Sequence, residues 1–418
     1  MKKLVALLLA LTLCIGLCAC GATAEKPAEE TPATTGETET PATDAKDIKV
    51  GFIFLHDENS TYDLNFINAA KAAAAELGLS DDQIMMKTNI AESQACYDAA
   101  AELVDAGCDL VITDSFGHES FALAAAKEFP EVQFVSCTGV KAHTEELSNF
   151  HNAFASIYEG RYLAGVAAGL KLNEMIENGD ITAEEAKMGY VGAYPYAEVK
   201  SGYTSFFLGA RSICPSVTME VTFTSSWYDE ALEKEAANKL INNGCVLISQ
   251  HADSMGAPTA CETAGVPNVS YNGSTESACP NTFIISSRID WTPYYEMVIK
   301  AVQDGTSLDA DWTGTLKTGS VVLTDLNDKV AAKGTAEKIA EVTKQLEDGT
   351  LHVFDTSTFT VNGETLTSYM ADVDTDADNT GDTEAIKDGY FHESEFRAAP
   401  YFNVQIDGIN LLDQNFGS

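Results

Sequence analysis

The feature that most constrains the fold is an alternation of short apolar runs with longer helical stretches from residue 49 onward. Apolar runs that are separated by helices are typical of strands in a parallel sheet, which helices cover on both faces. A first series of strands and helices is predicted at residues 49–55, 63–77, 84–90, 93–106, 110–113, 119–128 and 133–136. After a longer helix at 158–172, a second series is predicted, with strands at 188–193, 218–223, 246–249, 268–271 and 283–286 and helices at 198–211, 230–242 and 255–264.

Two successive series of this kind predict an α/β protein with two Rossmann-like lobes and a cleft between them. The body of roughly 370 residues also exceeds one comfortable hydrophobic core, which favours two lobes. We assign residues 47–157 and 288–325 to the first lobe. Residues 158–287 and 326–418 are assigned to the second lobe, with an acidic loop at about 371–385.

The first residues have the pattern of an export signal. Lys2 and Lys3 precede an almost unbroken apolar run at residues 4–13, which is too short to span a bilayer. The sequence Leu17-Cys18-Ala19-Cys20 resembles the bacterial lipobox. We therefore expect a signal peptide at residues 1–19, cleavage before Cys20, and attachment of diacylglycerol to the Cys20 thiol. The alternative is plain secretion with an incidental cysteine.

Residues 21–46, which follow that cysteine, contain no aromatic and no large aliphatic side chain. Such a segment cannot bury enough apolar surface to offset the entropy lost on ordering. Together with the lipidated Cys20, residues 20–46 are predicted to be a disordered tether.

Charge and motif content exclude several classes of function. The chain has 63 acidic and 25 basic residues, a formal net charge of −38, which argues against binding to nucleic acid or anionic lipid head groups. The cysteines after Cys20 show no Cys-x-x-Cys spacing, and the sequence contains no His-x-x-x-His, Gly-x-Ser-x-Gly or Walker motif. The sequence therefore predicts no metal centre, no cofactor and no catalytic residues. A disulfide between Cys261 and Cys279 is left open.

Four aspartates near the C-terminus imitate half of a calcium-binding loop. No register supplies both the central glycine and the terminal glutamate that such a loop requires. A solvated acidic loop is therefore the favoured interpretation of Asp372, Asp374, Asp376 and Asp378.

Polar and aromatic residues gather directly after the predicted strands, at residues 56–62, 114–118, 225–228, 250–254 and 271–274. Ligands of open parallel sheets bind outside the carboxyl ends of the strands. Loops from both lobes are therefore predicted to converge on one cleft.

Six short stretches follow one another in a fixed order: Ser115-Phe-Gly117, Tyr158-Glu-Gly-Arg-Tyr-Leu-Ala-Gly165, Leu208-Gly-Ala-Arg211, Ser226-Trp-Tyr-Asp229, Gln250-His-Ala-Asp-Ser254 and Trp291-Thr-Pro-Tyr-Tyr295. In this order they resemble the basic membrane protein family of ABC-transporter solute-binding lipoproteins, whose ligands are mainly purine nucleosides and bases. The resemblance implies a type I periplasmic-binding-protein fold, with two lobes joined by a three-stranded hinge. It extends from about residue 49 to about residue 325 and more weakly through 349–354.

In this family the ligand base lies between aromatic rings from the two lobes. The resemblance places Tyr62 at the first-lobe ring, where the most similar subgroup has Trp, and Trp227 at the second-lobe ring. Asn272 stands where the subgroup often has an acidic residue, and an amide can both donate and accept hydrogen bonds. This difference predicts an altered preference for the base or the sugar. The other ligand-binding candidates are Asn59, Ser115, Phe116, Asp253, Ser254, Trp291 and Glu159.

Each candidate also has a structural interpretation. Asp253 and Ser254 are intrinsically favoured as helix N-caps. A glutamate in the first turn of a helix, such as Glu159, is favoured by the helix dipole alone. Tyr62 precedes a helix and Trp227 also fits a packing role.

The sequence thus predicts a lipid-anchored receptor of an ABC importer on the extracytoplasmic face of the membrane, for a purine nucleoside or nucleobase. We expect a monomer that works with permease and ATPase subunits and needs no cofactor. The alternatives are a receptor for another solute, such as riboflavin or a sugar, and a lipoprotein that passes its ligand state to a membrane receptor. A nucleoside-cleaving enzyme is disfavoured because no catalytic constellation is recognisable.

Overall fold

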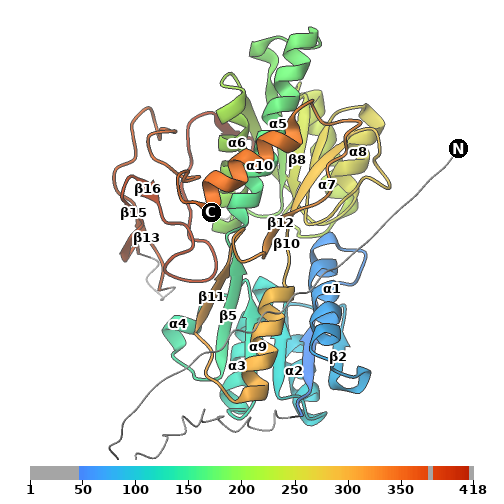
Figure 1. Ribbon diagram of the computed structural model, residues 1–418, viewed down its shortest axis with the longest axis vertical. Coiled ribbons are helices and arrows are strands. Elements are labelled where there is room, and N and C mark those ends of the chain that lie inside the picture. The colour runs from blue at the N-terminus through green and yellow to red at the C-terminus, as the bar shows by residue number, and fades with distance from the viewer. Residues whose placement is uncertain (1–46, 375–379, 414–418) are drawn as a thin grey trace, which may run out of the picture. The chain divides into compact units, whose positions relative to one another are not determined.

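Two sheets of mainly parallel strands form the framework of the protein (Figure 1). The computed structural model describes residues 47–374 and 380–413, all within one compact unit. The predicted signal peptide and the whole predicted tether, Cys20 included, lie outside the described residues, as does part of the acidic loop.

The first sheet has the strand order β11-β5-β4-β3-β1-β2, and all its strand pairs are parallel. Helices cover both faces because side chains alternate along each strand. Val50 and Phe52 of β1 pack with α1 and α9, whereas Ile53 packs with α2 and α3. The elements are β1 Val50–Ile53, α1 Thr61–Glu76, η1 Asp81–Gln83, β2 Ile84–Lys87, α2 Gln94–Asp105, β3 Leu110–Thr113, η2 Phe116–His118, α3 Glu119–Glu128, β4 Gln133–Cys137, α4 Ala142–Glu145, β5 Phe150–Ala155, α9 Thr292–Asp304 and β11 Asp311–Gly314.

The second sheet has the order β12-β10-β9-β8-β6-β7-β17, in which only the pair of β10 and β12 is antiparallel. Helices α5 and α6 cover one face, and α7 and α8 cover the other. The elements are α5 Ile157–Asn178, η3 Ala183–Glu185, β6 Lys187–Gly192, α6 Ala197–Ile213, β7 Thr218–Phe223, α7 Glu230–Asn242, β8 Leu247–His251, α8 Gly256–Ala264, β9 Asn268–Tyr271, β10 Phe283–Ile289, β12 Val321–Leu323, α10 Thr335–Glu347 and β17 Ile409–Leu411.

Helices α5 and α6 lie in unusually close contact. A Cβ atom added at Gly165 would lie 2.0 Å from the carbonyl oxygen of Phe206, and one at Gly209 would lie 2.1 Å from that of Tyr162. The backbones can approach this closely only because both positions lack a side chain. This contact accounts for two glycines in the stretches that resemble the family.

The chain crosses between the two sheets three times, after β5, after β10 and after β11. Two backbone hydrogen bonds join these crossings, from Ser156 N to the oxygen of Gly314 and from Asp290 N to that of Ser320, both at 2.7 Å. Short crossing segments that are hydrogen-bonded to one another are consistent with a hinge between the two lobes. Strand β12 pairs in the second sheet, although the proposed lobe boundary at residue 325 assigned it to the first lobe.

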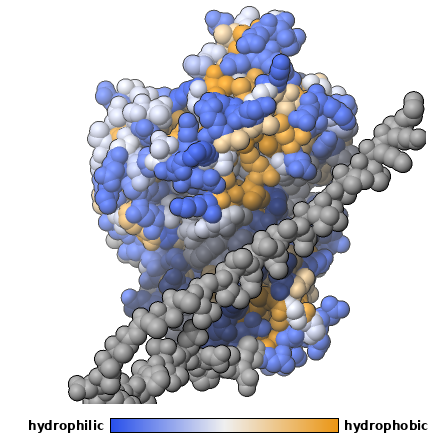
Figure 2. All heavy atoms as spheres, viewed as in Figure 1, coloured by the Kyte–Doolittle hydropathy of each residue, from blue (hydrophilic) through white to orange (hydrophobic). Residues whose placement is uncertain are grey.

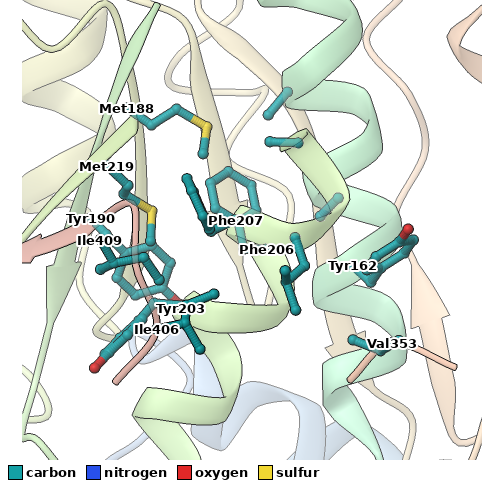
Figure 3. Packing of buried hydrophobic residues seen from close by; sticks show 14 of the residues in the cluster. Tyr162, Met188, Tyr190, Tyr203, Phe206, Phe207, Met219, Val353, Ile406 and Ile409 are labelled. Carbon is teal, nitrogen blue, oxygen red and sulfur yellow. The ribbon is translucent and has the colours of Figure 1, made fainter. Parts of the chain in front are cut away.

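The chain after residue 351 returns to the second sheet. Val353, Ile406 and Ile409 join the core around Tyr203 and Met219 (Figure 3). Within the predicted acidic loop, short strands pair on either side of the undescribed residues. These C-terminal strands are β13 Met370–Ala371, β14 Thr383–Glu384, β15 Ile386–Lys387 and β16 Tyr390–Phe391.

Most predicted elements are confirmed, including the helices at 119–128 and 230–242 and the strands at 110–113 and 268–271. The described cysteines, Cys261 and Cys279 among them, are free and buried. On the face seen in Figure 2, hydrophilic residues predominate and hydrophobic ones gather mainly over the second lobe. No helix among the described residues is long and apolar enough to cross a membrane.

Candidate functional site

Loops from the carboxyl ends of both sheets meet around a narrow inner pocket with a volume of about 30 Å³. This geometry follows from parallel strands, whose carboxyl ends lie at one edge of each sheet. The first lobe contributes residues that follow β1, β3 and β4, and the second lobe contributes residues at or after β7, β8 and β9 and in α6. The lining residues are Leu55, His56, Tyr62, Ser115, Phe116, Thr138, Glu198, Trp227, His251, Asp253, Tyr271 and Asn272.

Aromatic side chains from both lobes face this pocket. Tyr62 is fixed by its hydroxyl, which donates a hydrogen bond to the carbonyl oxygen of Asp114 at 2.6 Å. Trp227 rests edge-on against Tyr194, with ring centroids 5.2 Å apart, and near Tyr196 at 6.1 Å. Tyr62 and Trp227 are thus positioned by protein contacts, and both line the pocket.

A carboxyl and an amide form the polar part of the second-lobe wall. Asn272 Nδ2 donates to Asp253 Oδ1 at 2.9 Å, and both side chains are nearly buried. Asn272 has a φ of 65°, a left-handed conformation that asparagine tolerates better than most residues. Burial, followed by the charges of Glu233 and Asp63, raises the pKa of Asp253 well above its usual range. A protonated Asp253 can donate as well as accept a hydrogen bond.

A chain of hydrogen bonds lies beneath the second-lobe wall. Arg161, fully buried, donates to the hydroxyl of Tyr190 at 3.2 Å, which lies 3.3 Å from His251 Nδ1. His251 Nε2 lies 2.9 Å from a carboxylate oxygen of Glu198. If Tyr190 donates to Nδ1, Nε2 carries the proton and donates to Glu198. The chain thus orients Glu198 at the pocket wall.

Arg161 has aromatic rather than carboxylate surroundings among the described residues. Its guanidinium carbon lies 4.9 Å from the ring centroid of Phe206 and 5.2 Å from that of Tyr271. Its remaining polar partners are the hydroxyl of Ser249, at 2.7 Å, and the carbonyl oxygen of Ser270, at 3.3 Å. The cation is therefore stabilised by hydrogen bonds and ring faces. It supports Tyr271, which lines the pocket.

A second polar network orders the first-lobe loops. Asp63 accepts hydrogen bonds from the backbone N–H of His56 at 2.7 Å and from the hydroxyl of Ser60 at 2.6 Å. Burial pushes the pKa of Asp63 upward, but hydrogen bonds from His56, Asp114 and Ser60 outweigh it and lower the pKa. Burial and the neighbouring Asp63 charge raise the pKa of Asp114 well above its usual range. Asp114 Oδ1 accepts a hydrogen bond from Leu55 N at 3.1 Å, which joins the loop after β3 to the loop after β1.

The two lobes touch each other at the start of α1. The backbone N–H and the hydroxyl of Thr61 donate to the carbonyl oxygen of Asp253, at 3.2 and 3.1 Å. Asn65 Nδ2 donates to the carbonyl oxygen of Asn272 at 2.8 Å. The structure therefore shows a closed arrangement on this side of the pocket.

An outer chamber of about 440 Å³ adjoins the inner pocket. Phe116, Thr138, Glu198 and Trp227 line both spaces, so the two are continuous along these side chains. Residues far apart in the sequence complete the chamber. These are Val140, Phe154, Pro195, Tyr196, Ala197, Lys200, Asp372, Arg397, Ala399, Pro400 and Asn403.

Six predicted ligand-binding residues are thus brought together in the inner pocket: Tyr62, Ser115, Phe116, Trp227, Asp253 and Asn272. Asn59 lies outside it, in an exposed turn where its side chain bonds to Asp57. Ser254 also lies outside, because its hydroxyl accepts from Gly256 N at the start of α8.

The placement of two further candidates corrects the sequence-based expectation. Trp291 is 1% exposed and stacks on Phe66 in the first-lobe core, with ring centroids 4.5 Å apart. Glu159 lines a separate cavity and accepts from Leu316 N at 2.8 Å beside the hinge. Burial raises the pKa of Glu159 to about 7. Both residues therefore have structural roles.

Sequence reasoning missed several lining residues. His56 and His251 lie in the loops that it marked, but nothing in the sequence separated them from their neighbours. Thr138 directly follows β4 and has a φ of 64°, which is unusual for a β-branched residue and is found mainly at functional sites or turns. Sequence reasoning did not single out Glu198 as a pocket residue, because a glutamate in the first turn of a helix is common.

The Asp372, Asp374 and Asp382 carboxylates lie close together, with ligand atoms within 4.8 Å of one another. The carboxylate oxygens of Asp382 accept the backbone N–H groups of Val373, at 3.2 Å, and Asp374, at 2.9 Å. Part of the cluster therefore already serves to hold the loop. Asp376 and Asp378, also in the predicted acidic loop, lie outside the described residues.

Residues 56–351 match the model of a protein family described as "ABC transporter substrate-binding protein PnrA-like" (Bmp). The chain belongs to the Bmp family. It is thus an extracytoplasmic substrate-binding component of an ABC transporter, in a family whose members bind solutes and are not enzymes.

Two curated relatives and one solved structure agree with this assignment. A purine-binding protein of Brucella abortus is 32% identical over 315 residues, which cover 73% of this chain and 83% of that protein. A putative ABC transporter glucose-binding protein of Haloferax volcanii is 31% identical over 252 residues, 60% of each chain. An ABC-transporter solute-binding protein from Aeropyrum pernix superposes with a TM-score of 0.61 at 18% identity, covering 73% of this chain and 93% of that one. The predicted type I periplasmic-binding-protein fold is confirmed.

Proposed function

We propose that this Bmp-family protein captures a purine nucleoside or nucleobase in the inner pocket and delivers it to an ABC importer. The observation that carries the proposal is that Tyr62 and Trp227, from opposite lobes, line one narrow pocket together with Asp253 and Asn272. Flat rings suit a flat heterocycle, and an acid–amide pair suits the donors and acceptors on its edge. The purine-binding relative from Brucella abortus supports the same ligand class.

Capture on this proposal is a closing movement. The inner pocket, at about 30 Å³, has room for only one or two water molecules. A purine therefore requires the lobes or the facing side chains to move apart. A ligand that touches both lobes then favours the closed form, because the closed form alone offers both sets of contacts.

The proposal is tested by the small molecules retained by the purified protein and by calorimetry with purines, pyrimidines, riboflavin and sugars. Purines are expected to bind. Trp227→Ala and Tyr62→Ala should each weaken purine binding by about 1–3 kcal/mol, or roughly 5–150-fold. Trp312→Ala is the matched control, because Trp312 packs on Tyr294 away from the pocket and should leave affinity unchanged. Unchanged purine affinity in both pocket variants would refute the placement of the ligand.

A sugar is the second candidate ligand. The putative glucose-binding relative from Haloferax volcanii favours it, as do the carboxylates and exposed aromatic rings of the outer chamber. Tight binding of a free sugar by the wild-type protein, with no binding of purines, would establish this alternative.

Lipid anchoring forms a separate part of the proposal. We infer that Cys20 is acylated after cleavage of the signal peptide, because Lys2, Lys3 and the apolar run precede a lipobox-like sequence. Cys20→Ser should move the protein from the membrane fraction to the soluble fraction. Cys18→Ser, two residues away, should leave it in the membrane fraction. Equal membrane retention of both variants would exclude Cys20 as the anchor.

A further inference from the structure

The C-terminal segment, defined here as the described residues 352–374 and 380–413, lies beyond the part of the chain that matches the Bmp family model. It is built into the second lobe. Strand β17 pairs in parallel with β7, and Phe354, Phe391 and Phe402 are buried in the core of that lobe. Arg211 of α6 also donates to the carbonyl oxygen of Thr358 at 2.5 Å. The segment is therefore a fixed part of the second lobe.

The same segment also contacts the first lobe. The backbone N–H of Ala398 donates to Asp311 Oδ1 at 2.8 Å, and Ala398 is fully buried in a core cluster of the first lobe. His143 Nε2 lies 3.0 Å from the carbonyl oxygen of Val373, while its Nδ1 lies 3.3 Å from Asp311 Oδ2. The C-terminal segment, anchored in the second lobe, thus also contacts the first lobe, where it lies near α4 and β11 (Figure 1).

Arg397 holds together the part of the C-terminal segment that contacts the first lobe. Its guanidinium donates to the carbonyl oxygens of Ala399 at 3.1 Å, Pro400 at 2.9 Å and Asp372 at 3.3 Å. These bonds hold two stretches of the segment side by side on the wall of the outer chamber. Because Arg397 is 8% exposed and bonded to backbone oxygens, it offers little to an anionic ligand.

The outer chamber combines exposed rings with hydrogen-bonding groups. Phe116 and Tyr196 are 44% and 47% exposed, unusual values for large rings, and their centroids lie 5.8 Å apart. On the C-terminal side, Asp372 Oδ1 is buried and has no hydrogen-bond partner among the described residues. The Asp372 side chain as a whole is only half-buried and lines the chamber, so its carboxyl can accept a hydrogen bond from a ligand hydroxyl there.

We propose that the C-terminal segment is a specificity-determining wall of the binding site: the outer chamber receives a neutral, hydroxyl-bearing substituent of the ligand, and Asp372 accepts a hydrogen bond from it. The proposal rests on the proposed function, because it requires a base in the inner pocket. It favours a nucleoside over the free base. It also disfavours a nucleotide, since the Asp372 carboxylate that accepts from a hydroxyl would repel a phosphate group placed beside it.

Calorimetry with a purine base, its nucleoside and its nucleoside 5′-monophosphate tests the proposal. The wild-type protein should bind the nucleoside most tightly, and the monophosphate at least about tenfold more weakly. Asp372→Ala should weaken nucleoside binding by about tenfold or more, because hydrogen bonds to charged groups are the stronger class. Binding of the free base should change by less than about twofold.

Two further variants sharpen the result. Glu364→Ala removes an exposed carboxylate from the same segment outside the chamber and should leave all three affinities unchanged. Asp311→Ala removes the acceptor for Ala398 N without altering a chamber-lining side chain, and should lower the nucleoside-to-base affinity ratio. An unchanged ratio in Asp372→Ala and Asp311→Ala overturns the inference, as does equal wild-type binding of nucleoside and monophosphate. Failure of the wild-type protein to bind any purine instead overturns the proposed function.

Discussion

Two side-chain hydrogen bonds from α1 hold the lobes together beside the inner pocket, and their removal is expected to favour the open form. The Thr61 hydroxyl donates to the carbonyl oxygen of Asp253, and Asn65 Nδ2 donates to that of Asn272. Each bond contributes about 0.5–1.5 kcal/mol net. The double variant Thr61→Ala/Asn65→Ala should therefore shift the closing equilibrium by about 1–3 kcal/mol, roughly 5–150-fold. Neither side chain lines the pocket, so direct ligand contacts remain.

Small-angle scattering of the free and ligand-saturated protein measures this shift, and calorimetry measures its effect on affinity. If the free wild-type protein is mostly open, the dissociation constant should rise by the same factor by which the closing equilibrium falls, because affinity is proportional to the closed fraction. If the free protein is mostly closed, the dissociation constant should rise by less. Asn68→Ala, on the exposed part of the same helix, is the matched control. A double variant with wild-type scattering and wild-type affinity would show that these contacts do not govern closure.

Three further predictions concern pH and packing. The ion pair with Asp311, and then the Val373 carbonyl, raise the pKa of His143 above 6.5 against an opposing contribution from burial. Because the folded pKa of His143 is the higher one, this stabilisation is complete below the unfolded pKa and is lost as pH rises through the folded pKa. The protection factor of Ala398 N in hydrogen exchange, which is corrected for the intrinsic pH dependence of exchange, should fall over that range, and His143→Gln should abolish this fall. Gly209→Ala forces α5 and α6 apart and should lower the free energy of unfolding by about 1–3 kcal/mol in urea denaturation. Trp291→Ala should cost about 3–5 kcal/mol of stability, yet leave the purine affinity of the folded protein unchanged, opposite to Trp227→Ala.

The position of the cleft could be predicted from the sequence, because the ligand site of a parallel sheet lies at the carboxyl ends of its strands. Residues that follow consecutive strands must lie at one edge, so Ser115, Asp253 and Asn272 could be assigned to a common site from their positions alone. The aromatic pair came from the family resemblance, and the structure places both rings on the same pocket.

Sequence patterns failed where burial involved polar side chains or where an aromatic residue had two plausible roles. Strand β5 was missed because His151 and Asn152 interrupt its apolar pattern. Both are nevertheless buried, since His151 bonds to the Asp309 carbonyl and to Gln133, and Asn152 accepts from Ala142 N. Trp291 looked like a ligand contact beside a crossing, but only the folded core reveals that Phe66 covers its face.

The C-terminal segment shows most clearly what local patterns omit. A solvated acidic loop was predicted at about residues 371–385, yet Asp382 in that loop binds backbone N–H groups. Beyond the loop, Ala398 reaches the first-lobe core. Ala398 and its hydrogen-bond partner Asp311 are 87 residues apart, so no local sequence pattern predicts that contact. The consequence is mechanical as well as chemical: a segment anchored in the second lobe by β17 and bonded to Asp311 in the first must break or stretch those bonds whenever the lobes separate. Opening of the cleft and the shape of its outer chamber are therefore coupled, and a ligand that satisfies Asp372 favours closure through the same wall that selects it.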